Sequence, residues 1–349
     1  MPRMSKTTKV PARYVALLVQ ILEEQGIDCT PALGEAGVAR ASLRHNDALL
    51  SPDQVIAATR LLTEASGGQR DLGMRIGATT GPGQFGELGL GMLSCANVKD
   101  SLDLCAHYYV LVTPSFSMHT RMVGSAYELS WQPIQPVPYD VMVLAYDLTL
   151  TSFHTQLQGL LRDDMPGYDA YLFSPAPPDT QRYDALKPGR CHFGQGGLPT
   201  LRIVIDAEVL VRTPMPLAHA TNLAEIRQRL DVKLIHHLEQ DQRDWREWVA
   251  MMLSQAQAHQ PTQDELAAIV NVSTSTLARH LAAQGTTFRE LANEIRHERA
   301  CQWLREGQLR VADVAELLGY TNPANFIRAF KARAGVSPAL YGKAHAAGG

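Results

Sequence analysis

Three side chains in the last quarter of the chain, Arg279, Asn325 and Arg328, are of the types that bind the edges of DNA bases. Arginine can donate two hydrogen bonds to O6 and N7 of guanine, and asparagine can form an equivalent pair of bonds with adenine. An exposed arginine on its own is better explained as a solvated surface charge. Arg279 and Arg328, however, lie at matching places in a repeated pattern, 49 residues apart, and this favours contact with bases.

The repeated pattern consists of two similar segments, residues 265–285 and 313–335. In the first segment, Ala267 allows one helix to approach the next closely, and Asn271 tolerates the left-handed backbone that ends the helix. Ser273 then supplies the cap of a second helix. The second segment has Ala315, Gly319 and Asn322, followed by Pro323, at the matching places. This order of residues predicts two helix-turn-helix units.

A single helix of about 20 residues is expected to connect the two units. Thr287 and Glu290 form a capping box at its start. Its apolar stripe consists of Phe288, Leu291, Ile295, Trp303 and Leu304. Such a helix is roughly 30 Å long, close to the ~34 Å turn of B-DNA. A stiff connector of that length would place two recognition helices in successive major grooves, and Trp303 would then be a core residue.

Charge is unevenly distributed, although the formal net charge of −3 does not suggest a nucleic-acid binder. Residues 222–349 contain 15 Lys or Arg and 14 Asp or Glu, whereas the part before them has an excess of acids. Two segments, Leu266–Arg289 and Leu317–Gly349, have no acidic residue. Since carboxylates repel phosphates, these segments suit a surface that approaches DNA, with chance as the alternative.

The length of 349 residues predicts two domains. Residues 10–210 mix helical periodicity with strand patterns and predict an α+β domain. Residues 211–244 predict a helical linker, and residues 245–349 an all-α domain of short helices and tight turns. The expected helices of the α+β domain cover 12–25, 99–112 and 139–161, with another opened by Ser51 and Pro52. Its expected strands cover 115–123, 125–132 and 201–205.

Catalytic, cofactor and metal motifs are not expected in this chain. Gly81–Gly86 fits the spacing GxGxxG, but it contains proline and follows no clear strand, so a loop is the better explanation. His192 beside Cys191, and the pair His236-His237, lack the ligand spacing of a zinc site. The chain is therefore expected to be no enzyme and to hold no cofactor.

Five cysteines without a CxxC pair indicate free thiols in a reducing compartment. They are Cys29, Cys95, Cys105, Cys191 and Cys301. The N-terminal residues lack the features of a signal peptide, and no apolar run approaches the ~20 residues of a spanning helix. A cytoplasmic protein without membrane contact is expected.

Residues 245–349 resemble the AraC/XylS-type transcription regulators. The segment Asn322–Tyr341 is very similar to the family's signature, and Ser273–Leu281 with Gly285–Leu291 matches its first unit. More weakly, residues 10–210 are similar to the arabinose-binding type effector domain of that family. Phe85–Gly89 and Ser101–Tyr109 carry this likeness.

The resemblance implies which residues would contact DNA in the second helix of each unit. The base-facing positions would be Ser275, Ala278, Arg279, Ala324, Asn325 and Arg328. The phosphate-contacting positions would be Thr274, Thr276, Lys331 and Arg333. Two departures put the number of phosphate contacts in doubt. Gly342 stands where an arginine is common, and residues 274–276 lack a basic side chain.

A two-domain transcription regulator is therefore expected, with an N-terminal domain that senses a small molecule and supports a homodimer. The resemblance favours an activator, with double-stranded DNA as its partner and RNA polymerase as a further one. Expected effector contacts are Tyr108, Tyr109, Phe116, His119 and Trp131, because aromatic groups near the hairpin suit an apolar ligand; an ordinary core is the alternative. Competing hypotheses are an architectural DNA binder or partner-binding module without effector control, and an enzyme within residues 1–210.

Overall fold

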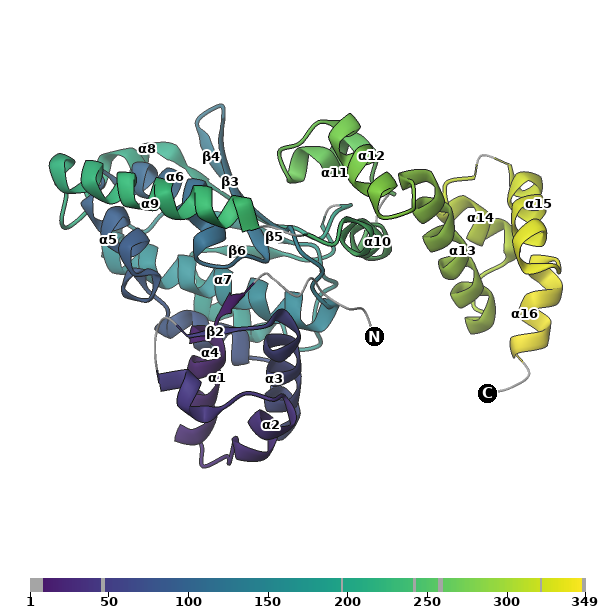
Figure 1. Ribbon diagram of the computed structural model, residues 1–349, viewed down its shortest axis with the longest axis horizontal. Helices are drawn as coiled ribbons and strands as arrows, with labels where there is room; N and C mark the ends of the chain where they lie inside the picture. The colour runs from purple at the N-terminus through teal and green to yellow at the C-terminus, as the bar shows by residue number, and fades with distance from the viewer. Residues whose placement is uncertain are drawn as a thin grey trace. The chain divides into compact units, whose positions relative to one another are not determined.

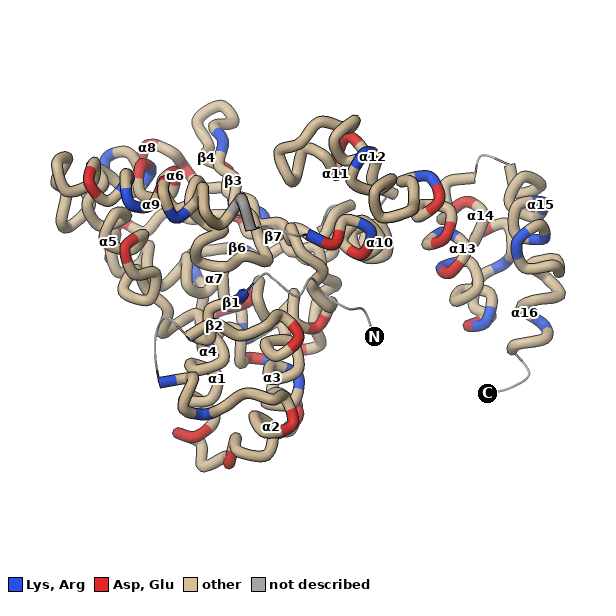
Figure 2. Tube along the Cα trace, viewed as in Figure 1, with Lys and Arg blue, Asp and Glu red and all other residues tan. Residues whose placement is uncertain are grey.

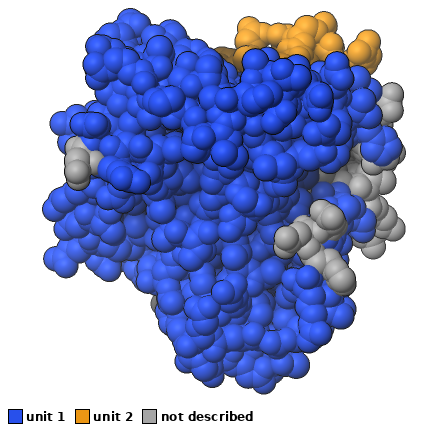
Figure 3. All heavy atoms as spheres, turned by 90° about the vertical axis from the view of Figure 1, so that its left-hand side faces the viewer, with its two compact units in different colours: residues 1–244 blue, residues 245–349 orange. Residues whose placement is uncertain are grey.

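The computed structural model describes residues 9–44, 48–195, 197–240, 243–256, 260–320 and 322–346. The chain forms two compact units, residues 1–244 and 245–349, which Figure 3 colours differently. The first unit combines helices with a five-stranded sheet, whereas every element of the second unit that the structure describes is a helix (Figure 1). This architecture confirms the expected fold class, an α+β part followed by an all-α part.

The sheet of the first unit has the strand order β3-β4-β7-β5-β6. Its strands are β3 (Phe116–Val123), β4 (Ala126–Pro133), β5 (Tyr168–Leu172), β6 (Arg190–His192) and β7 (Leu201–Asp206). β3 and β4 form the expected hairpin, with Gly124 at a φ of 63° between them. The neighbouring strands are antiparallel, apart from β5 and β6. A two-stranded sheet pairs β1 (Val10–Pro11) with β2 (Leu49–Leu50).

The helices of the first unit lie partly beside this sheet and partly in a separate N-terminal group (Figure 1). They are α1 (Arg13–Glu24), α2 (Thr30–Glu35), α3 (Pro52–Ala65), α4 (Leu72–Thr79), α5 (Glu87–Ser94), α6 (Val98–Tyr108), α7 (Tyr139–Leu161), α8 (Ala207–Arg212) and α9 (Ala220–Gln240). The short 3-10 helices are η1 (Arg40–Arg44), η2 (Pro82–Phe85), η3 (Tyr109–Leu111), η4 (Arg162–Asp164) and η5 (Gln181–Leu186). α3 starts as expected, because the Ser51 hydroxyl accepts from the Gln54 backbone N–H at 3.2 Å.

Two glycines allow α4 to lie directly against α7. A Cβ atom on Gly73 would be 2.4 Å from the carbonyl oxygen of Leu144, and one on Gly77 would be 2.4 Å from that of Leu148. Both distances are far below van der Waals contact, so only glycine permits this approach. The close crossing fixes the position of α7, whose other faces line the cavity described below.

The helix α9 lies within the range expected to be a linker, and in the structure it packs on the first unit. Its Ile226 and Leu230 are buried, and Gly91 of α5 faces both side chains. Arg229 and Lys233 form ion pairs of 2.9 and 2.6 Å with Glu87. The apolar and charged contacts together attach α9 to α5.

The second unit consists of seven helices over the residues that the structure describes there. They are α10 (Trp245–Gln255), α11 (Gln263–Ile269), α12 (Thr274–Ala283), α13 (Phe288–Glu306), α14 (Val311–Leu317), α15 (Pro323–Ala334) and α16 (Pro338–Ala346). α13 is the expected connector, with its capping box between Thr287 and Glu290. It runs between the pairs α11–α12 and α14–α15 (Figure 1). Trp303 is partly buried against the core of this unit, as expected of a packing residue.

Candidate DNA-binding surface and effector cavity

The two predicted turns have the backbone that their sequences require. Asn271 and Gly319 have positive φ values of 53° and 79°, and each lies two residues after the end of the first helix of a pair. Ser273 caps α12 by accepting from the Thr276 backbone N–H at 3.1 Å. Asn322 caps α15 by accepting from the Ala324 N–H at 2.8 Å. The caps and the left-handed residues hold each pair of helices at a sharp corner.

Each second helix has one buried and one exposed face. α12 buries Leu277 and Leu281, and α15 buries Phe326 and Phe330. The residues expected to face bases are all exposed, namely Ser275, Ala278, Arg279, Ala324, Asn325 and Arg328. Both helices therefore present an exposed face, and a major groove admits an α-helix.

Asn325 and Arg328 are joined on the exposed face of α15. The Arg328 Nη2 donates to the Asn325 Oδ1 at 2.6 Å. A guanidinium has five N–H donors and an amide oxygen has two lone pairs, so both groups keep capacity for a base. The pair thus orients Arg328 before DNA arrives without using up either group.

The phosphate-contacting positions differ between the two helices. On α15, Lys331 and Arg333 are exposed, and Figure 2 shows this helix marked by basic residues. On α12, Thr276 bonds to the hydroxyl of Ser273 at 2.8 Å, and the Thr274 hydroxyl donates to the carboxylate of Asp264. That carboxylate lies just before the acid-free segment, and the sequence pattern gave no reason to place it beside Thr274. The negative charge of Asp264 would repel a DNA phosphate bound at Thr274.

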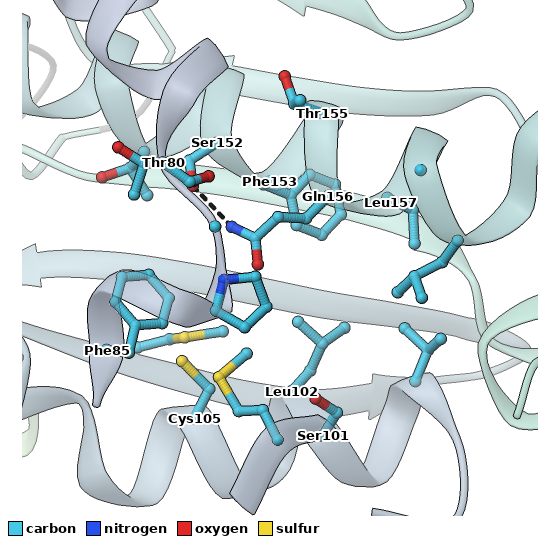
Figure 4. A pocket seen from close by; sticks show the side chains of 18 of the residues that line it. Thr80, Phe85, Ser101, Leu102, Cys105, Ser152, Phe153, Thr155, Gln156 and Leu157 are labelled. Atoms are coloured by element: carbon cyan, nitrogen blue, oxygen red, sulfur yellow. Dashed lines mark hydrogen bonds between the residues drawn. The ribbon is translucent and has the colours of Figure 1, made fainter. Parts of the chain in front are cut away.

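A cavity of about 400 Å³ lies in the first unit between α6 and α7, next to strands β3 and β4 (Figure 4). We call it the α6–α7 cavity. Its other walls are the segment from Ala78 to Phe85 and residues of α5. The residues that line it include neither an acid nor Lys, Arg or His. Cavities of this size hold small molecules, and a mainly apolar lining with a few polar groups is typical of such sites.

The five expected effector residues are divided in the structure. Tyr109 and Trp131 line the α6–α7 cavity, and Phe116 joins them around an adjacent cavity of about 120 Å³. Tyr108 lies elsewhere, since its hydroxyl donates to Asp231 of α9 at 2.5 Å. His119 is part-buried, and its ring nitrogen lies 3.1 Å from the Ser117 hydroxyl. Neither Tyr108 nor His119 lines either cavity.

Sequence reasoning missed the polar groups of the α6–α7 cavity. Ser152 and Gln156 on α7 and the buried Thr80 after α4 are among them. Ser152 and Gln156 are four residues apart and therefore share one face of the predicted helix 139–161, which was the available signal. Only the path of the chain after α4 shows that Thr80 meets them.

A buried carboxyl group, Asp147, lies on a different face of α7. It accepts hydrogen bonds from the Tyr183 hydroxyl at 2.7 Å and from Arg182 at 3.1 Å. Burial raises the pKa of Asp147 to about 6, against the lowering effects of Tyr183 and Arg182. The folded protein thus favours the protonated carboxyl more than the unfolded chain does.

This shift predicts a loss of stability with rising pH. Between the ordinary pKa of 3.8 and about 6, the unfolded chain releases the Asp147 proton while the folded protein retains it. The free energy of unfolding is therefore unaffected by this group below pH 3.8. Above about pH 6 it is lower by about 3 kcal/mol. Urea unfolding from pH 4 to 7 should therefore show that Asp147→Asn lacks this decline. Asp140→Asn is the control and should keep nearly all of the decline, because the hydrogen bond from Arg60 lowers the pKa of Asp140 and the contribution of this carboxyl is lost mainly below pH 4. Equal pH slopes for wild type and Asp147→Asn would contradict the prediction.

Two family models match the chain. Residues 26–214 match the arabinose-binding domain of AraC transcription regulators, and residues 266–344 match a helix-turn-helix domain. The described residues contain no cluster of three or more His, Cys, Asp or Glu that could hold a metal. Within the same residues, no helix is both long and apolar enough to span a bilayer.

Two relatives of the chain are transcription regulators by name. The chain is 26% identical to the ornithine utilization regulator of Pseudomonas aeruginosa over 96% of each chain. It is 38% identical to the transcriptional activator NphR of Rhodococcus over 24% of this chain and 25% of that protein. The crystal structure of the transcriptional regulator CdpR from Pseudomonas aeruginosa aligns with 19% identity and a TM-score of 0.42, over 90% of this chain and 98% of that one.

A small-molecule-binding domain joined to a double helix-turn-helix defines a DNA-binding transcription regulator, not an enzyme. The chain belongs to the AraC family of transcription regulators. This confirms the function that the two repeated segments predicted.

Proposed function

We propose that this regulator is a cytoplasmic activator that binds two successive major grooves and responds to a small molecule in the α6–α7 cavity. Residues 245–349 bind DNA, residues 10–210 sense the effector and dimerise, and residues 211–244 connect the two functions. The exposed faces of α12 and α15, built on one repeated pattern, are the observation that carries this proposal. The relative named a transcriptional activator supports the direction of control.

The proposal assigns roles to the exposed residues of the recognition helices. Arg279, Asn325 and Arg328 contact base edges, with Ser275, Ala278 and Ala324 packed beside them. Lys331 and Arg333 contact phosphates. Thr274 and Thr276 contribute less, because their hydroxyls already bond to Asp264 and Ser273.

Homodimerisation and contact with RNA polymerase belong to the same proposal. On α9, Val232 and Ile235 are 68% and 59% exposed, which is unusual for β-branched apolar side chains. They give the first unit an apolar surface for a second copy. RNA polymerase is the partner through which an activator bound beside a promoter would act.

A footprint of the full-length protein tests the proposal. We expect protection of two short elements about one helical turn apart, on one face of the duplex. Lys331→Ala should weaken binding to all sequences about equally and lower the salt dependence of log K by about one unit. Protection without sequence preference would instead indicate an architectural DNA binder.

A further inference from the structure

The α6–α7 cavity combines an uncharged interior with an amide oxygen that is held pointing into it. Among the polar side chains that line it, Thr79 and Thr80 donate to the backbone oxygen of Ile76, each at 2.9 Å. Thr149 donates to the backbone oxygen of Ala145 at 2.8 Å. These hydroxyl hydrogens are therefore directed at the backbone and away from a ligand.

Gln156 differs from these residues because a relay fixes its amide. The Ser152 hydroxyl donates to the backbone oxygen of Thr80 at 3.2 Å. Having one hydrogen, the hydroxyl can only accept from Gln156, whose Nε2 lies 2.7 Å away. The amide nitrogen must therefore face Ser152, and the oxygen must face the other way. Figure 4 shows the Gln156 oxygen directed into the cavity between α7 and α6.

Gln156 lies near the point where the cavity opens to solvent. Its side chain is half-buried, and nearby Ala78, Thr79 and Gly159 are exposed. Trp131 is 3% exposed and borders both this cavity and the adjacent one. The walls of the cavity are largely apolar. They include Phe85, Met92, Leu102, Met118, Phe153 and Leu157.

The ionisable groups of the lining are neutral near pH 7. Burial raises the pKa of Cys105 to about 12 and that of Tyr14 to about 12, although Arg13 counteracts the shift at Tyr14. Burial also raises the pKa of Tyr109 well above its ordinary value. A charged ligand would therefore lose its hydration and find no opposite charge in the lining, which is strongly unfavourable.

We propose that the α6–α7 cavity takes an uncharged, mainly apolar molecule with one hydroxyl or N–H group, which donates to the Gln156 amide oxygen. This inference rests on the proposed function, since it names the class of effector. It disfavours amino acids, which carry charges, and sugars, whose many hydroxyls would lose their hydration against a largely apolar lining. Gln156 determines specificity, and Ser152 positions it.

Matched probes test the ligand class by calorimetry on the full-length protein. 2-Naphthol and 1-decanol supply a ring or a chain with one donor, 2-methoxynaphthalene lacks the donor, and 2-naphthoate and decanoate are charged. We expect 2-naphthol or 1-decanol to bind. 2-Methoxynaphthalene should bind about 3- to 10-fold more weakly than 2-naphthol, because it cannot donate a hydrogen bond. The charged probes should bind at least about tenfold more weakly than their neutral counterparts. L-Ornithine and L-arabinose should not bind at this site.

Variants connect the preference to Gln156. Gln156→Leu should abolish the advantage of 2-naphthol over 2-methoxynaphthalene, whereas Gln158→Leu, an exposed position on the same helix, should preserve it. Leu102→Trp should fill the cavity and reduce binding of every neutral probe. The proposal is overturned if neither neutral donor binds, if the charged probes bind equally well, or if Gln156→Leu leaves the preference intact.

A separate measurement distinguishes this inference from effector control. If the neutral probes bind as expected but do not alter DNA affinity or transcription, the ligand class stands and control through this cavity fails. If ornithine or arabinose alters DNA affinity while the neutral probes do not bind, effector control stands and the ligand class fails.

Discussion

Replacing Arg279 and Arg328 together with alanine should lower affinity for the specific operator by about 30-fold to about 25,000-fold. Each arginine that bonds guanine is expected to contribute about 1–3 kcal/mol. The two side chains lie on separate helices, α12 and α15, and no hydrogen bond between them is present, so their contributions should add. Gel-shift titration against the operator and against a scrambled duplex measures the loss.

A comparison of the operator with the scrambled duplex distinguishes the loss of base contacts from the loss of positive charge. Affinity for the scrambled duplex should fall far less, and selection of binding sites with Arg328→Ala alone should give a relaxed preference at one base. Arg289→Ala with Arg305→Ala removes two exposed arginines of α13 and is the matched control. Either of two results would show that Arg279 and Arg328 contact only phosphate. In the first, the control variant loses as much affinity for the operator as the Arg279 and Arg328 variant does. In the second, both double variants lose affinity equally for the operator and the scrambled duplex.

Phe330→Ala should destabilise the second unit by about 3–5 kcal/mol. The Phe330 side chain is 2% exposed. Its ring centroid lies 5.7 Å from that of Phe326, 5.0 Å from that of His297 and 5.4 Å from that of Tyr341. It therefore joins α15 to both α13 and α16. Without it, α15 loses the support that presents Arg328 to DNA.

Urea unfolding followed by near-UV circular dichroism measures the free energy of unfolding of this variant. Leu340→Ala is the control, because Leu340 is 56% exposed on α16 and should cost under about 1 kcal/mol. We expect Phe330→Ala also to lose specific DNA binding although the base-facing residues are unchanged. A cost no larger than that of Leu340→Ala would show that this aromatic cluster does not hold the recognition helix.

The C-terminal half of the fold was predictable because its determinants are local. Asn271 and Gly319 end helices through backbone conformation, and Ser273 and Asn322 start helices through hydrogen bonds to residues two or three positions away. Such interactions are encoded within a few residues, and their repetition along the chain made them recognisable. The alternation of buried and exposed positions on α12 and α15 followed from helical periodicity alone.

The effector cavity was predictable only in part, because distant segments form it. Tyr109 and Trp131 could be proposed from their aromatic character, but Tyr108 bonds to Asp231, 123 residues later in the chain. Likewise, Asp264 reaches Thr274 only across the turn between α11 and α12. The sequence by itself determined the two helix-turn-helix units and their exposed faces. The tertiary structure alone decided that Thr80, Ser152 and Gln156 meet, because long-range packing of α4 against α7 through Gly73 and Gly77 brings them together.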